Sequence, residues 1–157
     1  ISYLPDCVAL PEWMKVEKLV KFYDDFYEDF STDKANDMLR SLNLNGEQRF
    51  KTLSKGNKEK VQLILVMSRD AKLYLLDEPM GGVDPATRDY ILNTIITNYS
   101  PDSAVVISTH LISDVENILD EVIFINQGEI ILEDSADNIR SENGKSVDAL
   151  FREVFRC

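Results

Sequence analysis

The stretch Lys72–Pro79, KLYLLDEP, constrains this chain more than any other part of its 157 residues. Its apolar residues Leu73–Leu76 predict a buried β-strand, because short apolar runs bounded by polar residues are typical of covered strands. The strand delivers Asp77 and Glu78 to its carboxyl end, the edge at which open α/β sheets bind their ligands. Two adjacent carboxylates there suit two tasks, holding a metal ion and handling a water molecule. The stretch is therefore typical of one half of a nucleotide-hydrolysing site.

The chain upstream of about residue 70 predicts mainly helices, after a first segment, ISYL, that resembles the end of a strand. The first helix follows Pro11 and carries apolar residues at spacings of three and four, as one face of an amphipathic helix does. These residues are Val16, Leu19, Val20, Tyr23, Phe26, Tyr27 and Phe30. The acidic residues between 24 and 29 are expected on the solvated face. Ser31 or Thr32 caps a second helix, and a third runs from Ser54 to about Arg69.

Beyond residue 70, short apolar runs alternate with helical patterns, which indicates a parallel sheet covered by helices. The expected strands are 73–77, 104–108, 122–126 and 129–132, and the expected helices are 86–98, 111–118, 135–141 and 146–155. The last two strands are joined by Gln127–Gly128, so they are expected to form an antiparallel hairpin. The fold class is α/β.

The net charge of −11 argues against a nucleic-acid-binding surface, which needs clustered Lys and Arg. It also argues against adhesion to an anionic membrane surface. Cys7 and Cys157 are expected to be unpaired thiols in a reducing compartment. We find no apolar run near the roughly 18–20 residues of a membrane span and no signal peptide, so we expect a cytoplasmic protein.

A phosphate-binding G-x-x-x-x-G-K-[ST] loop is missing from the sequence. Gly144–Ser146 contains Gly-Lys-Ser, but Ile139 stands where the earlier glycine is required, and no strand precedes the segment. We expect this segment to cap the last helix instead. A different anion site is suggested by LSKGN, Leu53–Asn57, where a serine cap, a glycine and the positive end of a helix dipole come together, although an ordinary helix cap is an open alternative.

Two further motifs follow the carboxylate pair. Gly81–Pro85, GGVDP, predicts a turn that leads into a helix, with Asp84 as its cap and proline at the first helical position. Strand 104–108 runs into Ser-Thr-His, and His110 is the chain's single histidine. The two strands are expected side by side, which brings their carboxyl ends to the same sheet edge.

The ordered set LSKGN, LLDEP, GGVDP and STH resembles the ATP-binding cassette ATPases, the motor domains of ABC transporters. The four motifs match the family's signature, Walker B strand, D-loop and switch histidine, and SYLPD resembles its Q-loop region. The resemblance implies a P-loop NTPase (RecA-like) core, in its carboxyl-terminal part, with an α-helical signature subdomain. Residues 1–70 would hold the end of the Q-loop and the signature subdomain, and residues 71–157 the core.

Roles for single residues follow from this resemblance alone. Asp77, with Asp6 at the Q-loop position, would hold Mg²⁺, Glu78 would handle the attacking water, and His110 would contact the γ-phosphate of ATP. The segment Ser54, Lys55, Gly56 and Asn57 would bind ATP carried by a second ABC ATPase subunit, identical or different, in a head-to-tail dimer. Asp84 would lie at the dimer seam.

Three departures from the family pattern bear on activity. Lys55 replaces a signature glycine, Asn57 replaces a glutamine, and Asp6 is one methylene shorter than the usual Gln or Glu. The Walker A strand, loop and helix are missing, so the chain is interpreted as a fragment of a longer ATPase that is inactive alone. A sheet that lacks a strand is expected to expose apolar edges and to self-associate.

The resemblance also implies a transmembrane permease as partner and a location at the inner face of the cell membrane. Trp13 and Met14 lie beside the Q-loop region, where transporter cassettes meet that partner, although a tryptophan folded onto its own helices is an open alternative. Two rival functions remain, namely a chromosome-maintenance or translation ATPase with the same cassette, and a non-catalytic interaction module.

Overall fold

The computed structural model describes residues 1–155, apart from the side chain of Asn143. The chain forms two compact units, one of residues 1–109 and one that begins at His110. The functional division expected at residue 70 stays a prediction. Cys7 is an exposed free thiol, as expected, and Cys157 lies outside the described residues. Within residues 1–155, no helix has the length and apolar character of a membrane span.

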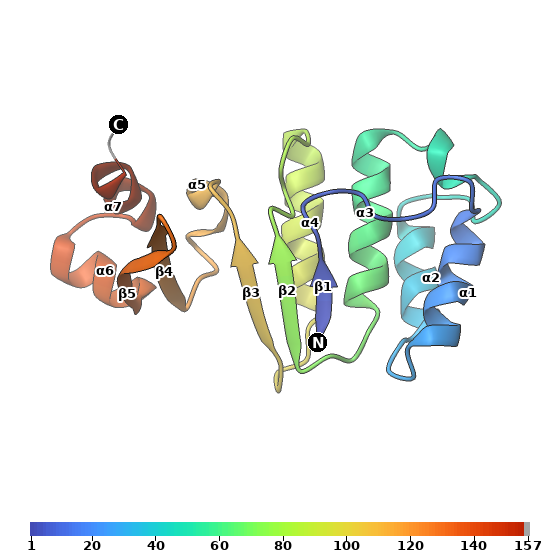
Figure 1. Cartoon of the computed structure of the whole chain (residues 1–157), viewed down its shortest axis with the longest axis horizontal. Helices are drawn as coiled ribbons and strands as arrows, with labels where there is room; N and C mark the ends of the chain where they lie inside the picture. Colours follow the sequence, from blue (N-terminus) through green and yellow to red (C-terminus); the bar gives the residue numbers. More distant parts are fainter. Residues whose placement is uncertain (156–157) are drawn as a thin grey trace. The chain divides into compact units, whose positions relative to one another are not determined.

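A parallel three-stranded sheet organises the first unit (Figure 1). Its order is β1 (Ser2–Leu4), β2 (Leu73–Asp77) and β3 (Ala104–Ser108), which confirms the expected strands and their adjacency. One face of β2 is buried through Tyr74 and Leu76. Tyr3, Leu75 and Val106 form a row across the other face, where Tyr3 and Val106 are more than half exposed. The described sheet thus has an exposed apolar row, whereas self-association stays a prediction.

The helices of the first unit are α1 (Val16–Phe26), α2 (Thr32–Ser41), α3 (Lys55–Met67) and α4 (Pro85–Asn98), with a 3-10 turn at Phe50–Thr52. Helix α3 packs against β1, against α4 and against the first two helices, so it lies between the sheet and the helical part (Figure 1). Its buried residues include Val61 and Leu63–Leu65, as the sequence predicted. Residues from α1, α2, Phe50 and α3 build one core.

The end of α1 differs from the expected pattern. The apolar spacing continues to Phe30, but the helix ends at Phe26 because Tyr27 takes an extended conformation. Phe30 is nevertheless buried, while Phe26 is mostly exposed. Asp29, expected in solvent, pairs with Arg69 at the end of α3. A tertiary ion pair therefore overrides the local periodicity at this point.

The second unit contains an antiparallel hairpin of β4 (Glu121–Asn126) and β5 (Glu129–Ser135), as expected. Its helices are α5 (Ile112–Val115), α6 (Ala136–Asn143) and α7 (Val147–Val154), and α5 is shorter than the predicted helix 111–118. Phe124 packs edge-on against Phe151 in its core. Gly144 ends α6 in a left-handed conformation and Ser146 caps α7, which confirms the capping role of this segment.

Candidate functional site

Asp77 and Glu78 lie at the carboxyl end of β2, and hydroxyl groups at the end of β3 contact both. Ser108 Oγ donates to Asp77 Oδ1, and Thr109 Oγ1 donates to Glu78 Oε2 over 3.1 Å. The Glu78 backbone N–H also donates to the Ser108 carbonyl over 2.8 Å. These bonds fix both carboxylates relative to the sheet. The sequence predicted the carboxylate pair, whereas the contact roles of Ser108 and Thr109 follow only from the strand register.

Glu78 has a left-handed backbone conformation with a φ of 44°. Such a conformation is rare for residues other than glycine and costs on the order of 1–3 kcal/mol. Strained residues of this kind cluster at functional sites, where the surrounding structure holds them in place. The strain supports Glu78 as a functional residue rather than as a solvated strand end.

His110 follows Thr109 in sequence and opens the second unit. Its contact with the carboxylates of the first unit stays a prediction.

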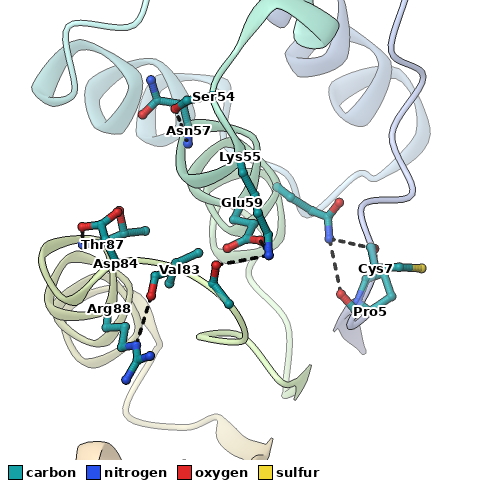
Figure 2. Close-up of polar contacts among 12 residues, drawn as sticks. Pro5, Cys7, Ser54, Lys55, Asn57, Glu59, Val83, Asp84, Thr87 and Arg88 are labelled. Carbon is teal, nitrogen blue, oxygen red and sulfur yellow. Dashed lines mark hydrogen bonds and ion pairs between the residues drawn. The ribbon is translucent and has the colours of Figure 1, made fainter.

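The amino end of α3 is capped by Ser54, whose Oγ accepts from the Asn57 N–H over 3.3 Å (Figure 2). Gly56 lies against α4, because an added Cβ would stand 3.1 Å from Thr87 Oγ1 and 3.7 Å from Asp84 Oδ2. A larger residue here would therefore need the Thr87 side chain to shift by a few tenths of an ångström. Ser54, Gly56 and Asn57 thus share one helix start, as predicted, where Ser54 is exposed and the other two are half-buried, and their role in binding stays a prediction.

Lys55 points across to the glycine turn that follows β2. Its Nζ donates to the Gly82 carbonyl over 3.1 Å and lies 3.9 Å from Glu59 Oε1 (Figure 2). Gly82 has a φ of +70°, a conformation that favours glycine, whereas the Lys55 ammonium 2.5 Å from an added Cβ is the end of a flexible side chain and could move aside. The Lys55 ammonium has two further N–H donors, and its side chain is 67% exposed.

Asp84 caps α4, as predicted, with Pro85 in the first turn. Its Oδ1 accepts from the Thr87 N–H over 3.0 Å and its Oδ2 from Thr87 Oγ1 over 2.7 Å (Figure 2). The bond from the Thr87 hydroxyl, with that from its N–H, lowers the pKa of the Asp84 carboxyl. Asp84 is thus held as a carboxylate beside the start of α3.

Asp6, Glu59 and Glu78 line one small cavity of about 20 Å³. This volume is enough for a single water molecule. Among the described residues, Glu59 Oε2 is buried and has no hydrogen-bond partner. Burial raises the pKa of the Glu59 carboxyl, Lys55 partly offsets the effect, and Asp6 adds to it. No local sequence pattern indicates Glu59, because only the fold brings it to this cavity.

The donor set fits Mg²⁺ in its chemistry. Asp77 and Asp6 offer hard carboxylate oxygens, the ligands that Mg²⁺ prefers. Residues 1–155 contain no cluster of three or more acidic, His or Cys side chains placed to hold a metal ion unaided. Mg²⁺ is commonly bound by one or two carboxylates together with waters and substrate phosphates, so such a cluster is not required.

A larger cavity, of about 330 Å³, lies near the amino end of β2, away from the carboxylate pair. Lys34, Arg69 and Tyr99 are among its lining residues. Open α/β sheets bind their ligands at the carboxyl ends of the strands, so we place the candidate site at Asp77 and Glu78 and not in this larger cavity.

Comparison with known proteins identifies the family and agrees with the fold. The family model described as ABC transporter matches residues 1–81. The ABC transporter ATP-binding protein YxlF of Bacillus subtilis is 26% identical over 155 residues, which cover 96% of this chain and 52% of YxlF. The lantibiotic transport ATP-binding protein SrtF of Streptococcus pyogenes is 36% identical over 93 residues, which cover 59% of this chain and 40% of SrtF.

Among solved structures, an ATP-binding subunit of an ABC transporter superposes with a TM-score of 0.83. The superposition covers 99% of this chain and 68% of that subunit at 24% identity, so it supports the P-loop NTPase fold. The chain spans about half, or less, of the length of the curated relatives that it matches. From the family match, the ordered motifs and the shared fold, we conclude that this chain belongs to the ABC transporter family, within its ATP-binding proteins.

Proposed function

We propose that this chain is the carboxyl-terminal part of a subunit that hydrolyses ATP in order to drive an ABC transporter. The observation that carries the proposal is the pair Asp77 and Glu78 at the carboxyl end of β2, each contacted by a hydroxyl from the end of β3. Membership of the family supports ATP as the nucleotide. The transported substrate is not specified by any residue of this site.

In this proposal the residues of β2 and the adjacent segments divide the chemistry. Asp77 and Asp6 would hold Mg²⁺, which neutralises charge on the phosphate oxygens when bound. Glu78 orients the attacking water and accepts its proton, while Thr109 holds the Glu78 carboxylate in place. His110 contacts the γ-phosphate. Positioning and charge stabilisation of this kind supply most of the catalysis in phosphoryl transfer.

The start of α3 supplies the second half of the site to a neighbouring subunit. Ser54, Lys55, Gly56 and Asn57 bind the ATP of that subunit in a head-to-tail dimer, where the positive end of the helix favours an anion. Asp84 would lie at the seam, and the packing of the start of α4 near Gly56 supports this part of the proposal. Each site in such a dimer needs residues from both subunits.

A mixing experiment with the full-length protein tests this arrangement. Glu78→Gln should lower ATP hydrolysis at least about a hundredfold, since a positioned acid or base contributes that much, while ATP binding persists. Ser54→Phe should block the α3 contribution that each subunit makes to the ATP site of its neighbour. Equal mixing of the two variants, followed by exchange of subunits, should restore about a quarter of the wild-type rate, because half of the dimers then carry one intact site of two.

The control is Glu133→Gln, which removes an exposed carboxylate on β5 and should leave the rate unchanged. A mixture as inactive as its parents would refute a head-to-tail site between identical subunits. Hydrolysis by Glu78→Gln at the wild-type rate would refute the role of Glu78.

The partner in the membrane is a permease, and the subunit acts at the inner face of the membrane. Trp13 supports this proposal, because its side chain is 72% exposed in the segment before α1 and so is not folded onto its own helices. The 157 residues contain no Walker A loop, so we expect the chain by itself not to hydrolyse ATP.

A further inference from the structure

Helix α3 buries one amide side chain, Gln62, which is only 5% exposed. Its sequence neighbours Val61 and Leu63 are buried apolar residues. A buried amide is unfavourable unless its donors and acceptor find partners. The partners of Gln62 therefore indicate why a polar side chain is present in the middle of this helix.

All the partners of Gln62 come from the segment that follows β1. Its Nε2 donates to the carbonyls of Pro5 and Cys7, at 3.4 Å each, along the dashed lines that end at these residues in Figure 2. Its Oε1 accepts from the Ala9 N–H over 3.2 Å. Pro5 and Cys7 flank Asp6, so one side chain holds the backbone on both sides of that carboxylate.

The face of α3 that carries Gln62 also contacts the glycine turn that follows Glu78. Lys55, Glu59 and Gln62 are spaced by four and three residues and so lie along one helix face. Lys55 donates to Gly82, and Glu59 lines the small cavity together with Asp6 and Glu78. This face contacts the segments on both sides of the cavity.

Asp6 and Glu78 approach each other around Gly81. A Cβ added to Gly81 would stand 3.6 Å from Glu78 Cβ and 4.0 Å from Asp6 Oδ1. A shift of the 5–9 segment would therefore change the distance between the two carboxylates directly.

We propose that Gln62 is a positioning residue that fixes Asp6 beside Glu78 by holding the 5–9 backbone. The expected effect of Gln62 on catalysis rests on the proposed ATP hydrolysis. The expected effect of Gln62 on the mobility of the 5–9 segment does not. Cys7 and Ala9 are exposed, so without Gln62 water can satisfy their backbone groups and the segment becomes mobile while the helix persists. A purely structural residue would instead affect stability without changing the mobility of this segment.

Cys7 is a free, exposed thiol within the segment and provides a direct probe. In the full-length protein with its other cysteines replaced by serine, a nitroxide on Cys7 reports the local mobility by electron paramagnetic resonance. Gln62→Leu should narrow the spectrum. Gln62→Met, unbranched and similar in volume, should do the same and covers the case in which the leucine variant fails to fold. Gln48→Leu, the same change at an exposed glutamine, is the control and should leave the spectrum unchanged.

Unlabelled samples of the same variants report the effect on catalysis. Gln62→Leu and Gln62→Met should lower kcat for ATP hydrolysis by roughly tenfold to a hundredfold with little change in KM, as expected for misplacement of a reacting group. An unchanged nitroxide spectrum in both folded variants would overturn the proposal. A mobile segment with wild-type kcat would overturn the positioning role. A wild-type protein that hydrolyses no ATP, with a segment still released in Gln62→Leu, would refute the proposed function and leave the backbone clamp established.

Discussion

Replacement of Arg69 by methionine should destabilise the first unit by about 2.5–3 kcal/mol. Arg69 donates to both carboxylate oxygens of Asp29, at 2.9 Å each, and to the Ile1 carbonyl over 2.8 Å. Its guanidinium lies 3.9 Å from the centre of the Tyr27 ring. One side chain thus joins the end of α3 to the helical part and to the start of β1.

The magnitude follows from how far the pair is shielded from water. Loss of one partner costs about 3–5 kcal/mol in a buried pair and about 0.2–1 kcal/mol in an exposed one. The Arg69 and Asp29 side chains are 13% and 33% exposed, so solvent screening lowers the buried value to about 2 kcal/mol. The contact with Tyr27 adds on the order of 0.5–1 kcal/mol.

The effect should depend on pH in a defined direction. The hydrogen bonds from Arg69 hold the pKa of the Asp29 carboxyl below its ordinary value of 3.8. A lowered pKa in the folded state means that the pair stabilises the fold above about pH 4, and that this stabilisation disappears as the pH falls through the folded value. The difference between wild type and Arg69→Met should therefore shrink in acid.

Urea unfolding followed by far-ultraviolet circular dichroism, near neutral pH and in acid, measures the loss of unfolding free energy and its change with pH. The matched control is Lys21→Met, which removes an ion pair with Asp25 within α1 at 3.1 Å. Both partners are more than half exposed, so the expected loss is only about 0.3–0.5 kcal/mol. Equal losses for the two variants, or a loss for Arg69→Met that does not change in acid, would refute the reasoning.

Two further predictions concern Glu59 and Trp13. Burial raises the pKa of Glu59 in the folded state, so wild type should lose stability as the pH rises above the ordinary value of 4.5, and Glu59→Gln should remove this loss. Urea unfolding at a series of pH values should show the variant more stable at neutral pH and equal to wild type in acid, whereas a gain that persists in acid would contradict the assignment. Trp13→Ala in the full-length protein should lower transport in proteoliposomes that contain the membrane partner. It should leave the ATPase rate of the isolated ATP-binding subunit unchanged. Unchanged coupling would exclude docking through this side chain.

Local chemistry explains which parts of the structure the sequence could predict. Ser54, Asp84 and Ser146 cap helices where expected, because a cap needs only a side-chain oxygen and an N–H three residues further on. The strand before Asp77 was equally clear from its apolar run. Register then placed Asp77 opposite Ser108, as the expected parallel pairing requires.

The missed features depend on residues far apart in the sequence. Gln62 finds its partners 53 to 57 residues away, and Arg69 finds Asp29 40 residues away. Neither pairing leaves a local pattern, and the aromatic spacing that continues to Phe30 favoured a longer α1 than the one observed. The sequence around Glu59 indicates only a helix, because the cavity that Glu59 lines exists only after folding. The roles of the candidate site residues stay predictions, and so does the participation of a second subunit.

Because Glu78 has a left-handed backbone conformation, stability and activity favour different residues at this position. Glycine takes this conformation without steric cost and asparagine takes it more easily than glutamate, so either would relieve part of the strain. Neither offers a carboxylate. Random mutagenesis scored only by thermal resistance should therefore enrich glycine or asparagine at residue 78, and the most robust molecules in such a collection would be inactive. A glutamate retained at residue 78 would then indicate selection for activity, at a cost in the stability of the folded protein.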